Sequence, residues 1–389
     1  MRHKLFVPWG TRLGAVLTAL CLFGCGSADN GNGSDSWDGY CSGGPVFGGS
    51  AKYLVENESG IQALTLEGGW AYWIASEVDA NGPSATVMRQ CDISDCENTL
   101  HSDTLPTTTG NMWLFADFIV SLVASNERLF WPTEWGVLPG ISRCKKSSCH
   151  KPDTINLGGA TVSYFILDGN QLVIATTEAT LLTCDEADCE GSLARVPVVA
   201  PTGEIAFAGA SNLAVDAEYY YFLSEQRILR LVKDGSMPFE VIARVVGKVK
   251  QLAVQGDSVY WLESFPPKLR SCPKTGCTSN PTTLAAELHD PFAVIVEDNA
   301  TYVSEPAESA VAAVLDQMLS PGSNRILRCS ETNCADLPFP AGDHGYEVAG
   351  SIAVDATNIY GIGRISSQGP YAEYCSAIYV TPKSTGAAQ

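Results

Sequence analysis

The sequence predicts an all-β protein folded as a seven-bladed β-propeller of four-stranded antiparallel blades, with the ring closed by an N-terminal strand. Three observations support this prediction. A pattern of four short strands repeats seven times at intervals of roughly 40–50 residues. Closely spaced cysteine pairs recur in most repeats, and the two ends of the chain each carry part of an incomplete repeat.

Each repeat has the same internal order of apolar and polar segments. An apolar run and a tight polar turn are followed by an aromatic run, as in "LAVQGDSVYWLES" and "IAVDATNIYG". A third short strand leads into a hairpin, and a fourth closes most units. Continuous apolar first strands are typical of strands buried on both faces, as in the centre of a propeller. A β-sandwich or β-helix does not explain a four-strand period repeated seven times.

The two ends of the chain indicate how the ring closes. The last unit ends at "STGAAQ" without a fourth strand, whereas "AKYLVEN" (residues 51–57) belongs to no unit. We therefore expect the N-terminal segment to complete the last blade. That arrangement brings Cys41 toward Cys375, so we expect a disulfide between them. It would contribute about 5 kcal/mol, because it closes a very long loop.

The spacing Cys-x4-Cys occurs five times, in a chain with fourteen cysteines. We expect a disulfide within each pair, contributing about 2 kcal/mol, because a short hairpin loop places its flanking residues opposite each other. The alternatives are zinc sites, for which each pair offers only two of four ligands, and free thiols. The expected pairs are Cys91 with Cys96, Cys144 with Cys149, Cys184 with Cys189, Cys272 with Cys277, and Cys329 with Cys334.

The N-terminus has the features of an export signal. A basic start is followed by the apolar run "LGAVLTALCLF", which is too short to span a membrane, and then by "LFGCGS". This segment resembles the bacterial lipoprotein lipobox. The resemblance implies a signal peptide at residues 1–24 and lipid, including an acyl chain such as palmitate, on Cys25. We expect a flexible tether at residues 25–40 and the propeller at residues 41–389. The alternative is an ordinary signal peptide with a chance cysteine.

These features predict a location at the cell envelope, outside the cytoplasm, with the lipid anchor in a bacterial membrane. The formal net charge is −19, from 24 basic and 43 acidic residues. Such a charge excludes nucleic acid as a partner, because phosphate binding needs a basic surface. It favours cationic partners, such as a basic protein or peptide, and leaves a glycan possible. We expect a monomer.

Acidic residues recur where the second strand of a unit ends. In a propeller these points approach one face, so they predict an acidic ring that binds a cation or basic ligand; the alternative is a solvated rim. Two aromatic residues lie in the same loops as candidate anchors, and the last unit has arginine instead of acid. The candidates are Glu77, Glu134, Trp135, Glu178, Glu225, Glu263, Phe265, Glu305 and Arg364.

Two further features are consistent with either binding or catalysis. The segment "EPAESAVAAVLDQMLSPGSN" predicts a helix of about three turns beside this face. His289 and His344 precede first strands and are the candidates for a metal site, although no local spacing enforces one. The motifs GxSxG and HExxH and phosphate-binding loops are absent from the sequence.

The segments "IAVDATNIYG" and "LAVQGDSVYWLES" resemble bacterial extracytoplasmic propellers with NHL- or YWTD-like repeats. The resemblance implies binding of proteins, peptides or glycans. One similar group, the streptogramin lyases, is enzymatic, but its His-based metal motif matches no position here. We therefore predict a binding or scaffold propeller that is not an enzyme and has no cofactor. The alternative is a propeller-type lyase or hydrolase that uses face carboxylates with a divalent metal.

Overall fold

The computed structural model describes most of the region predicted to form the propeller. The described residues are 52–61, 63–79, 82–105, 122–133, 140–204, 207, 210, 212–277, 280–286, 288–289, 291–297, 300–306, 324–330, 334–337, 347–364 and 375–383. They form 28 strands and two single-turn helices. No helix among them is long and apolar enough to cross a membrane. The lipobox and tether precede the described residues and stay predictions.

The strands form seven four-stranded antiparallel sheets, which are blades 1–7. Blade 1 contains β2 (Ala63–Glu67), β3 (Trp70–Asp79), β4 (Gly82–Asp92) and β5 (His101–Leu105). Blade 2 contains β6 (Val123–Ala124), β7 (Arg128–Pro132), β8 (Ile141–Lys145) and β9 (Ser148–Ile155). Blade 3 contains β10 (Val162–Asp168), β11 (Gln171–Thr176), β12 (Leu181–Asp185) and β13 (Ala194–Val196). Blade 4 contains β14 (Leu213–Val215), β15 (Tyr219–Ser224), β16 (Arg227–Val232) and β17 (Glu240–Arg244).

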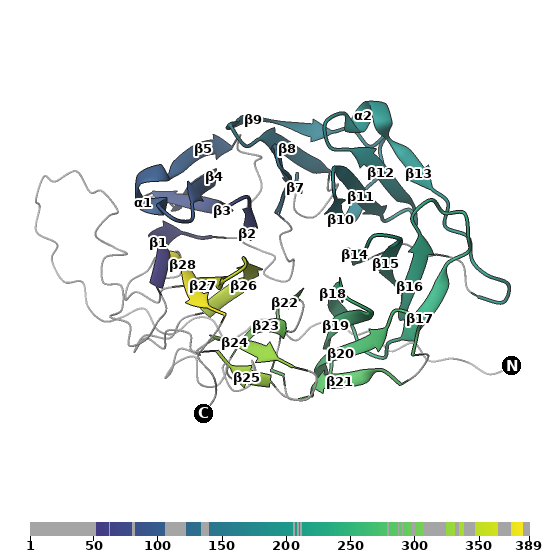
Figure 1. Ribbon diagram of the computed structural model, residues 1–389. Helices are drawn as coiled ribbons and strands as arrows, with labels where there is room; N and C mark the ends of the chain where they lie inside the picture. Colours follow the sequence, from purple (N-terminus) through teal and green to yellow (C-terminus); the bar gives the residue numbers. More distant parts are fainter. Residues whose placement is uncertain are drawn as a thin grey trace, which may run out of the picture. The chain divides into compact units, whose positions relative to one another are not determined.

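Blade 5 contains β18 (Val249–Gln255), β19 (Ser258–Ser264), β20 (Pro267–Pro273) and β21 (Thr282–Ala285). Blade 6 contains β22 (Ala293–Glu297), β23 (Ala300–Pro306), β24 (Asn324–Cys329) and β25 (Cys334–Asp336). Blade 7 contains β26 (Glu347–Val354), β27 (Asn358–Arg364), β28 (Cys375–Pro382) and β1 (Lys52–Ser59). The predicted seven-bladed propeller is confirmed. In Figure 1 the labelled first strands (β2, β10, β14, β18, β22 and β26) lie nearest the centre of the ring, and the fourth strands lie at its edge.

The N-terminal strand closes the ring as predicted. β1 pairs antiparallel with β28, with Tyr53 opposite Tyr379 and Ser59 opposite Cys375, and it forms the outer strand of blade 7. β26, the first strand of the same blade, lies beside β2 of blade 1 (Figure 1). Cys41 lies outside the described residues, so its bond to Cys375 stays a prediction. Most of the insertion between β23 and β24, with its predicted helix, also lies outside them.

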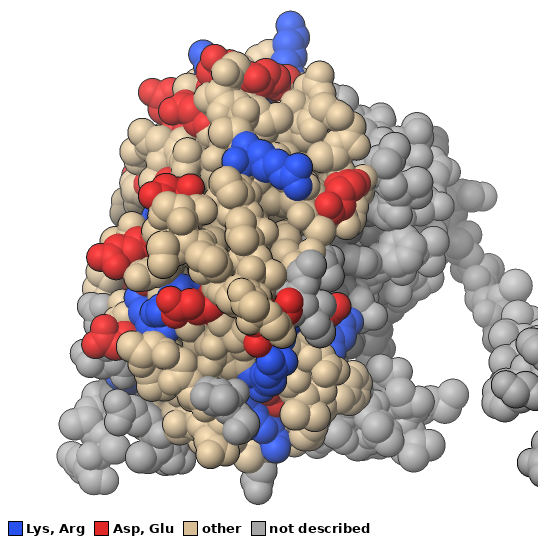
Figure 2. Space-filling view, turned by 90° about the vertical axis from the view of Figure 1, so that its right-hand side faces the viewer, with Lys and Arg blue, Asp and Glu red and all other residues tan. Residues whose placement is uncertain are grey.

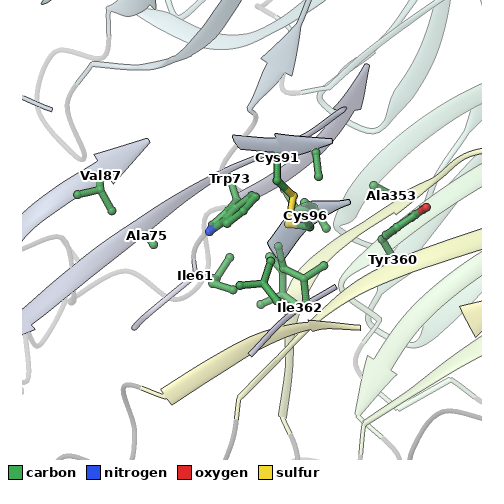
Figure 3. Packing of buried hydrophobic residues seen from close by; sticks show 13 residues of the cluster. Ile61, Trp73, Ala75, Val87, Cys91, Cys96, Ala353, Tyr360 and Ile362 are labelled. Carbon is green, nitrogen blue, oxygen red and sulfur yellow. A yellow bond between two sulfur atoms is a disulfide. The ribbon is translucent and has the colours of Figure 1, made fainter. Parts of the chain in front are cut away.

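The hydrophobic core is divided among the junctions between blades. Seven buried clusters occur in the described residues, and each joins two neighbouring blades. At the junction of blades 7 and 1, Trp73 is fully buried with Tyr360 and Ile362. Figure 3 shows this cluster, with the Cys91–Cys96 disulfide between Trp73 and Tyr360 in the view. Burial against both neighbours explains why second and third strands are rich in large apolar residues.

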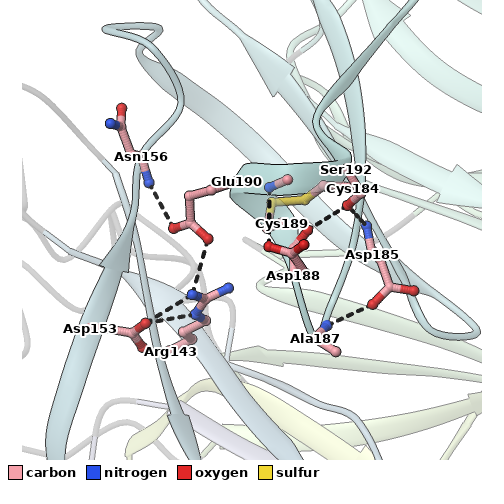
Figure 4. The surroundings of a disulfide bond; sticks show 11 residues. Arg143, Asp153, Asn156, Cys184, Asp185, Ala187, Asp188, Cys189, Glu190 and Ser192 are labelled. Atoms are coloured by element: carbon pink, nitrogen blue, oxygen red, sulfur yellow. Dashed lines mark hydrogen bonds and ion pairs between the residues drawn. A yellow bond between two sulfur atoms is a disulfide. The ribbon is translucent and has the colours of Figure 1, made fainter.

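The five local disulfides are confirmed. Each joins the third strand of its blade to the segment that follows it, with Cα–Cα distances between 4.0 and 5.6 Å. The second cysteine lies at the start of the fourth strand in blades 2 and 6, and before the fourth strand in blades 1, 3 and 5. Short helical turns, α1 (Cys96–Thr99) and α2 (Cys189–Ser192), follow two of these hairpins. The Asp188 carboxylate accepts from Gly191 N–H at 3.1 Å and caps α2 (Figure 4). Disulfides of this number are typical of a protein outside the cytoplasm.

Candidate functional site

The turns from second to third strands lie at one end of the blades, here called the upper face. Four of the predicted acidic residues, Glu178, Glu225, Glu263 and Glu305, lie near the ends of second strands at this face, but at different positions along the strands. Glu263 and Glu305 are within their strands, five residues after Ser258 and Ala300, where β19 and β23 begin. Glu225 and Glu178 follow the last residues of their strands. Because side chains alternate between the faces of a strand, a shift of one residue reverses their direction.

Glu263 is buried, with a relative exposure of 3%. Its Oε1 accepts from Trp261 Nε1–H at 2.9 Å, and its Oε2 accepts from Arg270 Nε–H at 3.1 Å. Trp261 is itself fully buried between blades 4 and 5. Glu263 therefore joins the second strand of blade 5 to the third, and both carboxylate oxygens are occupied by donors of the same blade.

Glu305 is fully buried and has a similar arrangement. Its Oε1 accepts from Arg325 at Nε (2.9 Å) and at Nη2 (2.6 Å). Its Oε2 accepts from the backbone N–H of His289 at 2.8 Å. Glu263 and Glu305 therefore do not contribute to the predicted acidic ring, because both side chains point into the blades and are paired with arginines there.

The corresponding positions of blades 3 and 4 show that this place in the strand accepts buried polar groups. Thr176 and Ser224 are also the fifth residues after the starts of their second strands, Gln171 and Tyr219. They are 0% and 1% exposed. Glu263 and Glu305 thus place a longer side chain where blades 3 and 4 have a short buried polar one. An arginine on the adjacent strand forms an ion pair with each carboxylate.

Glu178 and Glu225 do lie at the exposed surface. The pKa of Glu178 is lowered, chiefly because the carboxylate accepts from its own backbone N–H and also from Thr177 and Thr161. Glu225 has a positive φ of 55° in its turn, and its Oε2 lies 3.6 Å from Arg227 Nη2. Both carboxylates are thus partly engaged by their own blades, and their role in ligand binding stays a prediction.

The other predicted site residues are placed only in part. Glu77 lies in β3, opposite Ala85, and Arg364 lies in β27, opposite Ser376. Glu134 and Trp135 lie outside the described residues, as does His344. His289 contributes its backbone N–H to Glu305. Within the described ranges, no three His, Cys, Asp or Glu residues are grouped so that they could hold a metal ion.

The most exposed large apolar residues of the upper face belong to blades 4 and 5. Phe265, in the turn between β19 and β20, is 77% exposed, and Val246, between β17 and β18, is 86% exposed. The two segments touch, since a Cβ on Gly247 would lie 2.6 Å from the carbonyl oxygen of Phe265. Val245 N–H donates to Gln226 O at 2.9 Å, which joins them to the turn that carries Glu225.

We call this continuous surface, formed by Glu225, Val246 and Phe265, the blade 4–5 surface. The sequence identified Phe265 and Glu225 but missed Val246, which a "VVG" run before a first strand could have indicated. Figure 2 shows acidic and basic side chains interspersed on one side of the molecule instead of a continuous acidic area.

Comparisons with known proteins support the fold. No family model matches the sequence, and no curated protein does. Among solved structures, virginiamycin B lyase from Staphylococcus aureus is similar, with a TM-score of 0.55 and 11% identity, over 84% of this chain and 97% of that chain. A structure of YCF48 bound to D1 peptide is similar with a TM-score of 0.50 and 10% identity, over 87% and 96% of the two chains. The propeller is thus shared with an enzyme and with a peptide-binding protein.

Proposed function

We propose that this chain is a lipid-anchored binding propeller of the cell envelope that recognises a peptide or protein ligand through the blade 4–5 surface. The observation that carries the proposal is the exposure of Phe265 and Val246 on two touching loops of one face. Exposed aromatic side chains on a rigid scaffold are typical anchors in protein interfaces. The similarity to YCF48 bound to D1 peptide gives a precedent for peptide binding by this fold.

The chemistry of the surface favours a ligand with an apolar residue next to a basic one. Phe265 and Val246 offer apolar area, and the neighbouring Glu225 carboxylate is about half exposed, at 49%. A ligand that buries the Phe265 side chain removes the apolar area from water, which stabilises the complex. A basic group beside Glu225 would add a short-range attraction that salt weakens.

The test is a random peptide library displayed on phage and selected against the full chain. Enriched peptides are synthesised, and their dissociation constants are measured by fluorescence anisotropy. We expect Phe265→Ser to weaken binding at least tenfold. Met237→Ser is the matched control, because Met237 is also exposed, at 59%, but lies in the connection between β16 and β17. Equal binding by the parent and Phe265→Ser would contradict the proposal.

An enzyme is the second candidate, favoured by the similarity to virginiamycin B lyase. Of the predicted face carboxylates with described side chains, Glu178 and Glu225 are exposed and are the groups that such chemistry would use. The test is incubation of virginiamycin B with the full chain, with and without added divalent metal, followed by mass spectrometry. Turnover that is lost in Glu178→Gln or Glu225→Gln would replace the binding proposal with catalysis.

A further inference from the structure

A lysine from one blade reaches an acidic residue of the preceding blade at several junctions. The lysine follows the third strand, and the acid ends or follows the first strand, so both lie on the lower face, opposite the turns described above. Lys274 Nζ lies 2.5 Å from Asp216 Oδ2, and Lys233 Nζ lies 2.5 Å from Asp168 Oδ2. Lys383 pairs in the same way with Glu297.

A fourth junction shows a related arrangement. Lys146 of blade 2 lies over the ring of Tyr72 in blade 1, with Nζ 4.5 Å from the ring centroid. Glu67, on the same blade as Tyr72, acts on Lys146 electrostatically. Lys274 likewise lies 5.8 Å from the centroid of Tyr221. The place beside the acid and the tyrosine ring thus receives an alkylammonium group.

The backbone shows which residue takes the place of lysine at every described junction. Lys274 N–H donates to Asp257 O in the first hairpin of its own blade, at 2.8 Å. In blade 1 the same bond runs from Ile93 N–H to Gly69 O, at 3.0 Å. In blade 3 it runs from Glu186 N–H to Asn170 O, at 2.8 Å. Ile93 and Glu186 therefore stand where other blades have lysine.

At two of the three junctions without the lysine, the preceding blade also has no acidic residue at the facing position. The exception is the junction of blades 7 and 1, where the ring closes. Glu186 faces blade 2, whose residue corresponding to Asp216 is Ser125. In the sequence, Glu331 has the corresponding position in blade 6, outside the described residues, and blade 5 has Gln255. Blade 7, in contrast, keeps Asp355 although its neighbour carries Ile93.

Asp355 has the same environment as Asp216, apart from the lysine. Tyr221 Oη donates to Asp216 Oδ2 at 2.9 Å, and Tyr360 Oη donates to Asp355 Oδ2 at 2.5 Å. Burial alone would raise the pKa of Asp355, but hydrogen bonds from Tyr360 and from the backbone of Thr357 and Asn358 outweigh it, and the pKa is lowered. Asp355 is therefore ionised at neutral pH. No Lys, Arg or His in the described part of the chain lies within ion-pair distance of it.

An open pocket of about 700 Å³ lies at this place. It is lined by Asp355 and Val354 from blade 7, and by Glu67, Asp92 and Ile93 from blade 1, together with neighbouring residues. We propose that this pocket binds a primary alkylammonium group supplied by another molecule, in the place that a lysine of the next blade occupies elsewhere in the ring. The ligand class is a lysine side chain of a protein partner or a small alkylamine.

The geometry defines how the group would bind. The ammonium would lie against Asp355 Oδ2, as the Lys274 ammonium lies against Asp216 Oδ2. The alkyl chain would pass Ile93, which is half-buried and packs against the core of the junction. Glu67 also lines the pocket, but it already acts electrostatically on Lys146 of blade 2, so Asp355 is the acid that receives the ammonium. This site is independent of the blade 4–5 surface, which is formed by turns at the opposite ends of the strands.

The test uses the full chain labelled with ¹³C at isoleucine δ-methyl groups. Nα-acetyl-lysine methylamide should shift the Ile93 methyl signal with saturation, and added salt should weaken binding. Nα-acetyl-norleucine methylamide, which has the same chain length without the ammonium, should not bind. Butylamine distinguishes the sources: equal affinity identifies a small alkylamine as the ligand, and tighter binding of the lysine derivative identifies a lysine of a protein partner.

Two variants decide whether Asp355 and the empty lysine position are responsible. Asp355→Asn should weaken binding at least tenfold, while Asp216→Asn, the matched change where Lys274 is already present, should leave it unaltered. Ile93→Lys should abolish binding by placing an internal ammonium in the pocket, and Ile93→Leu should retain it. Asp355 is also part of a turn, so Ile93→Lys remains decisive if Asp355→Asn does not fold. Binding of norleucine equal to lysine, or unchanged binding by Ile93→Lys, would overturn the proposal.

Discussion

Replacement of Glu305 by glutamine distinguishes a structural carboxylate from a ligand-binding one. The change keeps the size of the side chain but removes its charge. If the carboxylates of the upper face repelled one another, each Glu→Gln change would raise the melting temperature, because it would remove a repulsive charge. The observed contacts predict the opposite for Glu305, because its carboxylate is fully buried and accepts three hydrogen bonds.

The expected effect follows from these contacts. Removal of one partner of a buried ion pair costs about 3–5 kcal/mol, because the other charge stays buried without compensation. Arg325 is 27% exposed and keeps a contact of 3.3 Å with Asp336, so the lower limit applies. We expect a loss of about 3 kcal/mol, or roughly 5–10 °C in melting temperature.

Differential scanning calorimetry and urea unfolding followed by circular dichroism measure the change. Glu225→Gln is the matched control, because the Glu225 carboxylate is exposed and its contact with Arg227 is long, at 3.6 Å. Such an exposed ion pair contributes at most about 1 kcal/mol. The reasoning is refuted if Glu305→Gln melts at the temperature of the parent or above it. A loss of equal size in both variants would likewise show that burial of the carboxylate is not the cause.

Three further predictions follow from other parts of the structure. Burial alone would raise the pKa of Asp216, but hydrogen bonds from Lys274, Tyr221 and the backbone lower it to about 2. The ionised carboxylate therefore contributes about 2 kcal/mol to the free energy of unfolding at pH values above its unfolded-state pKa. This contribution is lost as the pH falls from about 4 toward 2. Asp216→Asn should therefore be less stable at pH 7 and lose less stability over that acid range; an unaltered acid-unfolding curve would contradict this. Replacement of Cys184 and Cys189 together by alanine should lower stability by at least about 2 kcal/mol in urea unfolding, since both are also buried in a core cluster; a variant as stable as the parent would show that the bond is dispensable. Peptide mapping without reduction should link Cys41 to Cys375; a free thiol on either would refute that pairing.

The architecture could be predicted from the sequence because its signals are local. The alternation of apolar runs and polar turns specifies strands and hairpins within each unit, and the spacing Cys-x4-Cys specifies bonds that cross one hairpin. Closure by β1 followed from counting strands, since "AKYLVEN" had no unit and the last unit lacked a strand. None of these inferences required knowledge of which blade contacts which residue.

The directions of the acidic side chains could not be predicted in the same way. Glu263 and Glu225 both follow an aromatic run in the sequence, but Glu263 is one residue nearer the start of its strand and points into the blade. A signal was present, because Trp261 lies two residues before Glu263 and therefore on the same side of the strand. The lysine–acid pairs were missed because they join different blades, and only the register of both hairpins brings Lys274 to Asp216.

The internal repeat gives each blade a comparison within the same chain, and this comparison separates structural from functional charge. Glu263 and Glu305 occupy a position that blades 3 and 4 fill with buried polar residues, and each has its own arginine, so their charge is accounted for by the fold. Asp355 differs, because the fold supplies its tyrosine and backbone donors but not the lysine that its counterpart Asp216 receives. A buried or half-buried carboxylate without its cation is less stable than a paired one. The ammonium proposed for this pocket would therefore stabilise the junction at which the ring closes, through the same contact that stabilises its sister junctions.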